Sequence, residues 1–321
     1  MISNKTYLKL LFSIFIIIGI SVMSYSVNFA KNYPLPIIDH ISFDAKMKFI
    51  RDHIDINEID TIVVGSSLAL NNVNGVILEE NSKTCKHVLN ISVWSISALQ
   101  VEKILELTTI FPNLERIIYS GQFTSFNFAN VFKKFDTDLL KKYMQNKLSP
   151  LEYAAFIANA CKDLSFCKKR EEEWKKEYMD NTKFSYLDFD HTGSAPLHIY
   201  GKDIIKSRWN RGDGPVQNPN ALKALARIAD NTQKRDIRFY FIQQPYRQAM
   251  IDKSPNIQKI MKSFPIDIAK IIGKYNGTFF NLHEKLHLDD THFADRSHLN
   301  DKGSSIGSQE IAKFIDAKEA K

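Results

Sequence analysis

The sequence has 321 residues, 44% of them hydrophobic and 25% charged, with a formal net charge of +7. A chain of this size can bury a full core, so a single α/β domain with an appendage is the first expectation. Its lysines and arginines are spread along the chain instead of forming one basic arm, which argues against a nucleic-acid-binding protein.

The N-terminal segment has the pattern of a membrane helix. Lys5 and Lys9 precede 21 residues, Leu10 to Ala30, that include no charged side chain. A helix of that length spans the roughly 30 Å of a bilayer's hydrocarbon. The positive-inside rule then leaves the N-terminus in the cytoplasm and places the rest of the chain across the cytoplasmic membrane. A cleaved signal peptide is the alternative, although Asn28 replaces the small residue expected three positions before a cut after Ala30.

The three cysteines contain no C-x-x-C pair that would indicate structural zinc. If the domain lies outside the cytoplasm, Cys161 and Cys167 are close enough in sequence to close a small disulfide loop, leaving Cys85 as a buried thiol. Two unpaired thiols are the alternative.

Strand and helix patterns alternate over most of the remaining chain. Strands are expected at residues 59–64, 87–93, 114–119, 237–243 and 278–281, and helices at 43–54, 98–111, 256–275 and 302–317. Strands separated by helices imply a parallel sheet with right-handed crossovers and a ligand cleft at the carboxyl ends of the strands.

The alternation is expected to stop between Gln122 and about Arg235, where charged helical patterns and a Gly-, Pro- and Asn-rich section occur. This region is too long for a connecting loop. We therefore expect an anchor at residues 1–30, an α/β catalytic domain at 31–121 and 236–321, and a largely helical insertion subdomain at 122–235 that lies over one end of the sheet.

Two distant motifs suggest a catalytic site. Gly65-Ser66-Ser67 follows the first strand, and Asp295 stands three residues before His298. A serine hydroxyl is a useful nucleophile when a base accepts its proton and a third group orients that base. Ser67 is the expected nucleophile, His298 the base and Asp295 its partner, with backbone N–H groups after Ser67 binding the oxyanion. Alone, each motif is also typical of a strand-ending turn or a loop before a helix.

These residues resemble the SGNH (GDSL-like) hydrolase superfamily. Its first block is a Gly-x-Ser turn, and its last is Asp-x-x-His followed by Leu, Asn and Gly, as in Asp295 to Gly303. The resemblance implies a three-layer α/β sandwich of the SGNH or flavodoxin-like kind. It also implies that Ser95 stands for the oxyanion glycine of the second block and that Gly121-Gln122 stands for the third block, whose Asn is missing.

A Gly-Ser-Ser turn with degenerate middle blocks and an anchor is similar to one branch of this superfamily, the DltD-like and AlgJ/AlgX-like proteins. That similarity implies a single-pass protein of the cytoplasmic membrane whose domain faces the periplasm or the outside. It would transfer an O-acyl group, acetyl or D-alanyl, to or from a cell-envelope polysaccharide, beside a membrane-bound O-acyltransferase and without a cofactor.

Arg247 follows the fourth strand at the edge of the expected cleft, where its side chain either holds substrate or is exposed to solvent.

Two other interpretations stay open. The missing third-block Asn is compatible with a non-catalytic scaffold of an envelope acylation or export complex. His283-Glu284-Lys285-Leu286-His287 fits the H-E-x-x-H zinc pattern, but that pattern requires a continuous helix, and here it directly follows a strand. We therefore expect no metal.

The role of Trp94 also has two interpretations: it either lines an acyl pocket or packs in the core.

Overall fold

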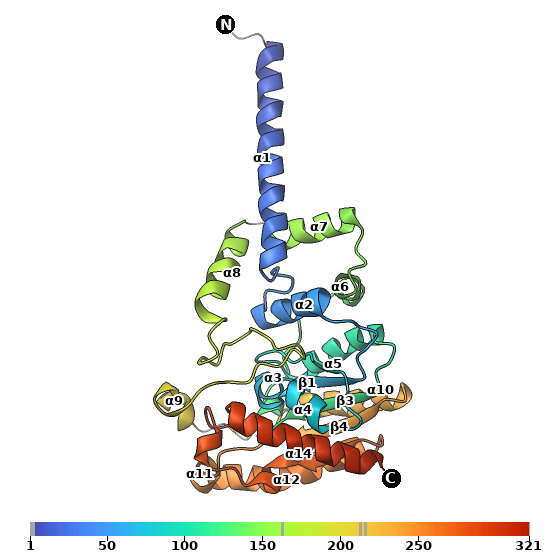
Figure 1. The fold of residues 1–321 in the computed structure, drawn as a ribbon, viewed down its shortest axis with the longest axis vertical. Helices are drawn as coiled ribbons and strands as arrows, with labels where there is room; N and C mark the ends of the chain where they lie inside the picture. Colours follow the sequence, from blue (N-terminus) through green and yellow to red (C-terminus); the bar gives the residue numbers. More distant parts are fainter. Residues whose placement is uncertain (1–3, 162–163, 212–213, 215–216, 321) are drawn as a thin grey trace.

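The computed structural model describes residues 4–161, 164–211, 214 and 217–320. Residues 1–3 of the expected anchor and residues 162–163, 212–213 and 215–216 of the expected insertion lie outside this description. The fold is built on one five-stranded sheet with the order β2-β1-β3-β4-β5, in which every neighbouring pair is parallel (Figure 1). The strands are β1 (Thr61–Gly65), β2 (Val88–Asn90), β3 (Arg116–Gly121), β4 (Arg238–Gln243) and β5 (Thr278–Asn281). The expected parallel α/β architecture is thereby confirmed.

Helices cover both faces of the sheet, because the central strands are apolar on both sides. In β1, Ile62 and Val64 belong to the larger core, whereas Val63 belongs to a second core on the other face. Against the first face lie α5 (Ala98–Glu106), α10 (Pro219–Lys234) and α12 (Pro255–Gly273), and against the second lie α3 (Ser67–Asn72), α4 (Gly75–Asn81) and α14 (Asp301–Glu319). The result is a sandwich of three layers.

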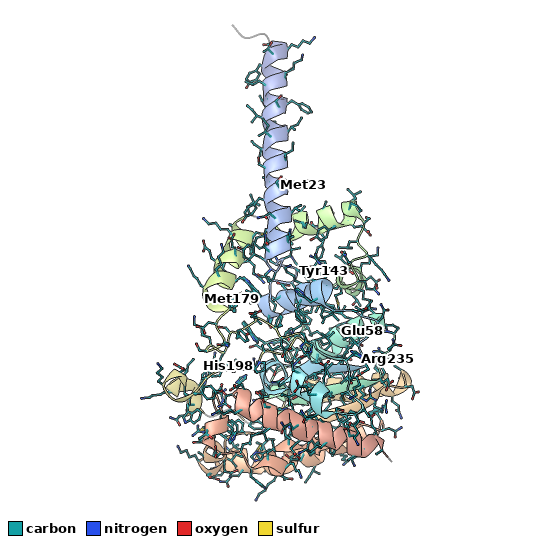
Figure 2. All side chains as sticks on the ribbon, viewed as in Figure 1. Met23, Glu58, Tyr143, Met179, His198 and Arg235 are labelled. Atoms are coloured by element: carbon teal, nitrogen blue, oxygen red, sulfur yellow. A yellow bond between two sulfur atoms is a disulfide. The ribbon has the colours of Figure 1, made fainter. Side chains whose placement is uncertain are left out.

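Helix α1 (Asn4–Asn32) extends away from the domain (Figure 1). It is long and apolar enough to cross a membrane, and its side chains, such as that of Met23, project away from the rest of the protein (Figure 2). Only its last turns enter the domain, where Ser26, Phe29 and Ala30 are buried. Helix α2 (Ile41–His53) follows α1 and continues the larger core.

The segment between β3 and β4 forms most of the surface around α1 and one flank of the sheet. It contains η2 (Phe123–Phe126), α6 (Thr137–Met144), α7 (Pro150–Ala160), α8 (Leu164–Glu177), η3 (Gly201–Asp203) and α9 (Lys206–Trp209). A disulfide joins Cys161 to Cys167, and Cys85 is a buried free thiol. The last helix of this segment, α10, packs on α5, α12 and β4, so the helical covering of the sheet resumes at Pro219, earlier than the sequence analysis expected.

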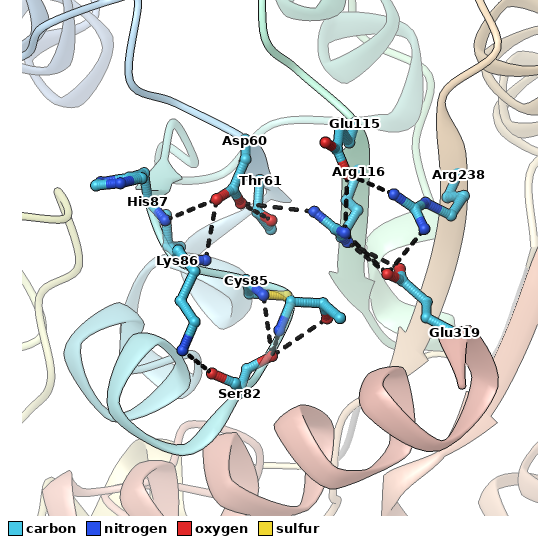
Figure 3. A network of polar contacts seen from close by, with 12 residues as sticks. Asp60, Thr61, Ser82, Cys85, Lys86, His87, Glu115, Arg116, Arg238 and Glu319 are labelled. Atoms are coloured by element: carbon cyan, nitrogen blue, oxygen red, sulfur yellow. Dashed lines mark hydrogen bonds and ion pairs between the residues drawn. The ribbon is translucent and has the colours of Figure 1, made fainter.

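A charged network closes the amino edge of the sheet (Figure 3). Glu319, at the end of α14, accepts hydrogen bonds from Arg116 at 2.8 Å, from Arg238 at 2.8 Å and from the Tyr240 hydroxyl at 2.9 Å. The Arg116 and Glu319 side chains are each only 5% exposed. Because α14 begins three residues after His298, at Asp301, this network fixes the far end of the helix that follows the His298 loop. The remaining short elements are η1 (Leu107–Ile110), α11 (Gln248–Asp252), α13 (Leu282–Leu286) and η4 (Asp290–His292).

Candidate active site

Ser67 lies at the carboxyl edge of the sheet because β1 ends in a turn that brings α3 close to β3. A Cβ at Gly65 would lie 2.4 Å from the carbonyl oxygen of Ser120, so only glycine permits this approach. Ser66 is the N-cap of α3, and Ser67 is its first residue. The hydroxyl of Ser67 therefore projects from the end of a buried strand, at the edge where α/β proteins hold their ligands.

The loop before α14 brings His298 and Asp295 to the same place. His298 Nε2 lies 2.9 Å from the hydroxyl oxygen of Ser67, and His298 Nδ1 lies 2.9 Å from Asp295 Oδ2. The side chains thus form one continuous hydrogen-bonded chain, although Ser67 and His298 are 231 residues apart in sequence. This geometry allows the imidazole to accept the hydroxyl proton while the carboxylate orients the ring.

Asp295 is held in its ionised form. Its side chain is 3% exposed, and its Oδ1 accepts the backbone N–H groups of Ser297 at 2.8 Å and His298 at 2.7 Å. Burial alone would raise the pKa of Asp295, but the charge of His298 and these hydrogen bonds outweigh burial and lower it to about 2. The carboxylate is therefore available to stabilise an imidazolium throughout the neutral range.

Asn72, which the sequence analysis did not single out, connects the two halves of the site. It is fully buried in the last turn of α3, donates from Nδ2 to the Ser297 carbonyl at 3.0 Å, and accepts the Leu299 N–H at 2.9 Å. These two bonds bracket His298 in the chain. Asn72 therefore fixes the helix that bears Ser67 relative to the loop that bears the imidazole.

A cavity of about 530 Å³ opens at this edge and contains both Ser67 and His298. Its other walls are formed by Trp94, Ser95, Tyr178, Thr182, Lys183, Phe184, Ser185, Asp203, Ile205 and Arg208. Most of these belong to the segment between β3 and β4, so the insertion forms much of the pocket. Trp94 is one of the walls and also packs beside Tyr178, with ring centroids 5.2 Å apart. Trp94 therefore lines the cavity and also packs against a neighbouring ring.

Ser95 has a left-handed backbone conformation. Its φ is 48°, a left-handed value that glycine adopts without strain and serine adopts rarely. Within the described part of the chain, no backbone hydrogen bond is found in which the N–H group of Ser67 or Ser95 is the donor. Both residues line the cavity.

Phe184 and Arg208 cover the imidazole from the insertion side. The Phe184 ring meets that of His298 edge to face at 5.6 Å between centroids, and the Arg208 guanidinium lies 4.6 Å from the Phe184 ring centroid. Neither contact has a local sequence signal, because Phe184 is more than 100 residues from His298 in the chain and Arg208 is more than 20 residues from Phe184. The two side chains limit the space above the Ser67–His298 pair.

Gly121 and Gln122 do not line the cavity. Gly121 ends β3 and pairs with Gln243, and the buried Gln122 side chain donates from Nε2 to the carbonyl oxygens of Gln244, at 3.3 Å, and Pro245. The amide expected to substitute for the third-block Asn therefore bonds to the backbone that follows β4. In this structure Gln122 fixes that stretch of backbone.

Arg247 is buried and not solvent-exposed, but its partners are protein groups outside the cavity. Its guanidinium contacts Asp290 Oδ1 at 2.8 Å, donates to the Trp209 carbonyl at 2.6 Å, and lies 3.8 Å from the centroid of a Trp209 ring. Its backbone N–H donates to the carbonyl of Arg296. Arg247 thus ties α9 of the insertion to the loop that carries Asp295 and His298.

The H-E-x-x-H string is not one continuous helix. Helix α13 ends at Leu286, and His287 has a left-handed φ of 45°, so the two imidazoles do not share a helix face. Burial lowers the pKa of His283 to about 4, and its Nδ1 accepts the Tyr246 N–H at 3.4 Å. In the described ranges, no three His, Cys, Asp or Glu side chains lie together as a metal site.

A scan against protein-family models found no match for the sequence, and a search of curated proteins found none either. The site is therefore interpreted from its own geometry.

Proposed function

We propose that this protein is a membrane-anchored serine acyl-transfer enzyme that acts outside the cytoplasm on O-acyl esters of a cell-envelope polysaccharide. The observation that carries the proposal is the hydrogen-bonded chain from Ser67 through His298 to Asp295, with Ser67 and His298 open to a cavity of about 530 Å³. A cavity with a nucleophile, a base and backbone donors is the arrangement that acyl transfer requires.

The proposed reaction has two stages. Ser67 Oγ attacks the ester carbonyl carbon while His298 Nε2 takes the hydroxyl proton, and the N–H groups of Ser67 and Ser95 bind the resulting oxyanion. The imidazolium then gives its proton to the departing alkoxide, the ester C–O bond breaks, and the acyl group stays on Ser67. In the second stage His298 deprotonates an acceptor hydroxyl or water, whose oxygen attacks the carbonyl carbon of the acyl-enzyme. The imidazolium then returns its proton to Ser67 Oγ as the bond from Oγ to the acyl group breaks, and the new ester or the free acid leaves.

Two features support the compartment and the anchor. α1 has the length and composition of a membrane-spanning helix, and Lys5 and Lys9 near its start favour a cytoplasmic N-terminus. The Cys161–Cys167 disulfide is compatible with an oxidising environment on the other side. Transfer to a glycan hydroxyl, with a membrane-bound O-acyltransferase as partner and the acyl group acetyl or D-alanyl, is proposed from the resemblance of the Gly-Ser-Ser and Asp-x-x-His motifs.

The decisive experiment treats full-length protein in detergent with a fluorophosphonate probe and with p-nitrophenyl acetate. Ser67→Ala should abolish labelling and lower turnover by about 10⁴-fold or more, and His298→Ala should do the same. Ser66→Ala is the matched control, since the Ser66 side chain makes no capping hydrogen bond, and it should keep activity within a few-fold. A labelled Ser67→Ala variant would remove the assignment of the nucleophile.

The alternative is a non-catalytic scaffold that retains the fold. The observation in its favour is Gln122, whose amide is committed to backbone carbonyls and leaves the third-block donor unreplaced. A scaffold predicts no labelling of the wild-type protein and no turnover above that of the Ser67→Ala variant.

A further inference from the structure

Exposed apolar side chains are concentrated in one part of the domain. Outside α1, eight large apolar side chains are exposed in the described part of the chain, and four of these lie between residues 131 and 166. They are Val131 (62% exposed), Leu151 (81%), Leu164 (40%) and Phe166 (44%). Because soluble surfaces usually scatter such residues singly, their clustering marks a contact surface.

The cluster lies where α1 enters the domain. Helix α7 contacts α1 and runs across it close to the buried residues Ser26, Phe29 and Ala30 (Figure 1). If α1 spans the bilayer along its normal, α7 lies parallel to the membrane plane. The 21 uncharged residues that end at Ala30 cover the roughly 30 Å of hydrocarbon, which places the boundary with water at the level of α7.

One face of α7 is apolar and exposed. Leu151, Ala155 and Ala158 follow the i, i+4, i+7 spacing of a single helix face and are exposed, whereas Phe156 and Ile157 are buried in the larger core. The disulfide between Cys161 and Cys167 holds the first turn of α8 beside the end of α7. That turn adds Leu164 and Phe166 to the same end of the molecule.

Exposed cations occur in the same segments as these apolar side chains, and Lys133 and Lys134 line one hollow together with Phe166. Lys133, Lys134, Lys147 and Lys168 are exposed and form no salt bridge with any described residue. The exposed Tyr25 and the half-buried Tyr33 lie on either side of the buried Phe29 at the base of α1, with ring centroids 6.3 and 5.3 Å from that of Phe29. Aromatic rings at the end of a spanning helix and basic groups beside apolar ones are the features of a protein surface that lies in a lipid headgroup layer.

We propose that the exposed face of α7, the first turn of α8 and Val131 together form a membrane-docking surface that rests in the headgroup layer of the leaflet from which α1 emerges. Its ligand is the phospholipid bilayer, with a preference for anionic headgroups. The surface gives the domain a fixed orientation, which a single helix alone would not impose. The inference does not depend on the acyl-transfer proposal.

The experiment places an environment-sensitive NBD fluorophore on Leu151→Cys in full-length protein reconstituted into nanodiscs. Leu151 is 81% exposed, so the label should not disturb folding. The matched control is Ile266→Cys, which is 69% exposed on α12 at the opposite end of the molecule (Figure 1). The buried thiol of Cys85 makes the unsubstituted protein a blank for labelling.

In nanodiscs, the label at position 151 should shift its emission to the blue and be quenched several-fold by lipids that carry a headgroup-level nitroxide. It should be shielded from aqueous iodide, and the quenching should strengthen when anionic lipid is added. The label at position 266 should stay solvent-like. Iodide access at position 151 equal to that at 266 overturns the proposal. So does shielding from iodide without quenching by the nitroxide lipid, because that outcome indicates a protein partner or a second copy on this face.

Discussion

Two buried polar side chains, Asn72 and Asp295, determine how the candidate site is held together. Neither side chain reaches the cavity; Asn72 bonds to the backbone on both sides of His298, and Asp295 bonds to the imidazole itself. A buried polar group that loses its partner costs about 1–3 kcal/mol, so each is a strong restraint on the imidazole. Turnover should therefore be sensitive to residues that contact no substrate.

Asn72→Ala tests this restraint. Without Asn72 the His298 loop loses both bonds to α3, and we expect kcat for p-nitrophenyl acetate to fall about 10- to 100-fold with little change in KM, because binding surfaces are untouched. Asn81→Ala removes an exposed side-chain bond to the Ile77 carbonyl on α4 and should leave kcat unchanged. An Asn72→Ala enzyme that folds and keeps its full kcat would show that the loop is positioned by other contacts.

The depressed pKa of Asp295 gives a second prediction. Its folded-state pKa of about 2 lies below the ordinary 3.8, so the carboxylate contributes stability above about pH 4 and loses it as the pH falls through about 2. Over the assay range Asp295 stays ionised, and the acid limb of kcat/KM should show one ionisation that is not that of Asp295. Asp295→Asn should lower kcat by about 10³- to 10⁴-fold. A second acidic ionisation near pH 4 that vanishes in this variant would contradict the expectation.

At the level of elements, the positions of the strands could be predicted from the sequence more accurately than the end of the insertion. Every expected strand lies within about three residues of an observed one, because buried parallel strands are short apolar runs bounded by turn residues. The expected insertion, residues 122–235, wrongly includes helix α10. The sequence does contain a signal for this helix: Pro219 follows the N-cap residue Asn218, and apolar residues recur at helical spacing at Ala221, Leu225 and Ile228. The Gly-, Pro- and Asn-rich stretch before it obscured where the insertion ends.

Some residues of the candidate site could be predicted from the sequence, and others could not. Ser67, Asp295 and His298 were predictable because a strand-ending turn and a short loop motif carry them locally. Phe184 and Asn72 were not singled out, since their roles come from contacts with His298 and its neighbours that depend on tertiary packing. For Asn72 a signal existed, because a polar side chain on a short helix after a central strand has to find buried partners.

The network at the amino edge should stabilise α14 without affecting catalysis (Figure 3). Glu319→Gln removes the one buried carboxylate beside Arg116 and leaves it with Glu115 and Asp60. We expect a loss of about 1–3 kcal/mol in the free energy of unfolding, measured by denaturant titration. Lys313→Ala on the same helix removes only an exposed pair with Glu310 and should cost less than about 0.5 kcal/mol. Because the network lies at the opposite edge from Ser67, kcat of the folded Glu319→Gln enzyme should match that of the wild type. Equal stabilities of the two variants would refute the network's role.

At the scale of the whole molecule, the insertion connects the end of the domain at which α1 enters (Figure 1) to the cavity. Its first part includes α7 and α8 beside α1, and its later part supplies Phe184 and Arg208 above His298. One buried cation, Arg247, joins the later part to the loop that carries His298, through contacts with Trp209, Asp290 and Arg296. The pocket therefore depends on an ion pair that lies outside it.

Arg247→Lys isolates this dependence, because lysine keeps the charge but cannot make the bidentate contact with Asp290 or stack on Trp209 in the same way. With α9 released, the wall formed by Ile205 and Arg208 should loosen, and KM for p-nitrophenyl esters should rise about 10-fold while kcat changes less than about 3-fold. Hydrogen exchange should increase at residues 203–210 and stay unchanged in β1 and β3. Lys206→Gln, an exposed change on α9 itself, should alter neither quantity. If Arg247→Lys instead lowered kcat at constant KM, Arg247 would act on the position of His298 through the Arg296 carbonyl and not on the pocket wall.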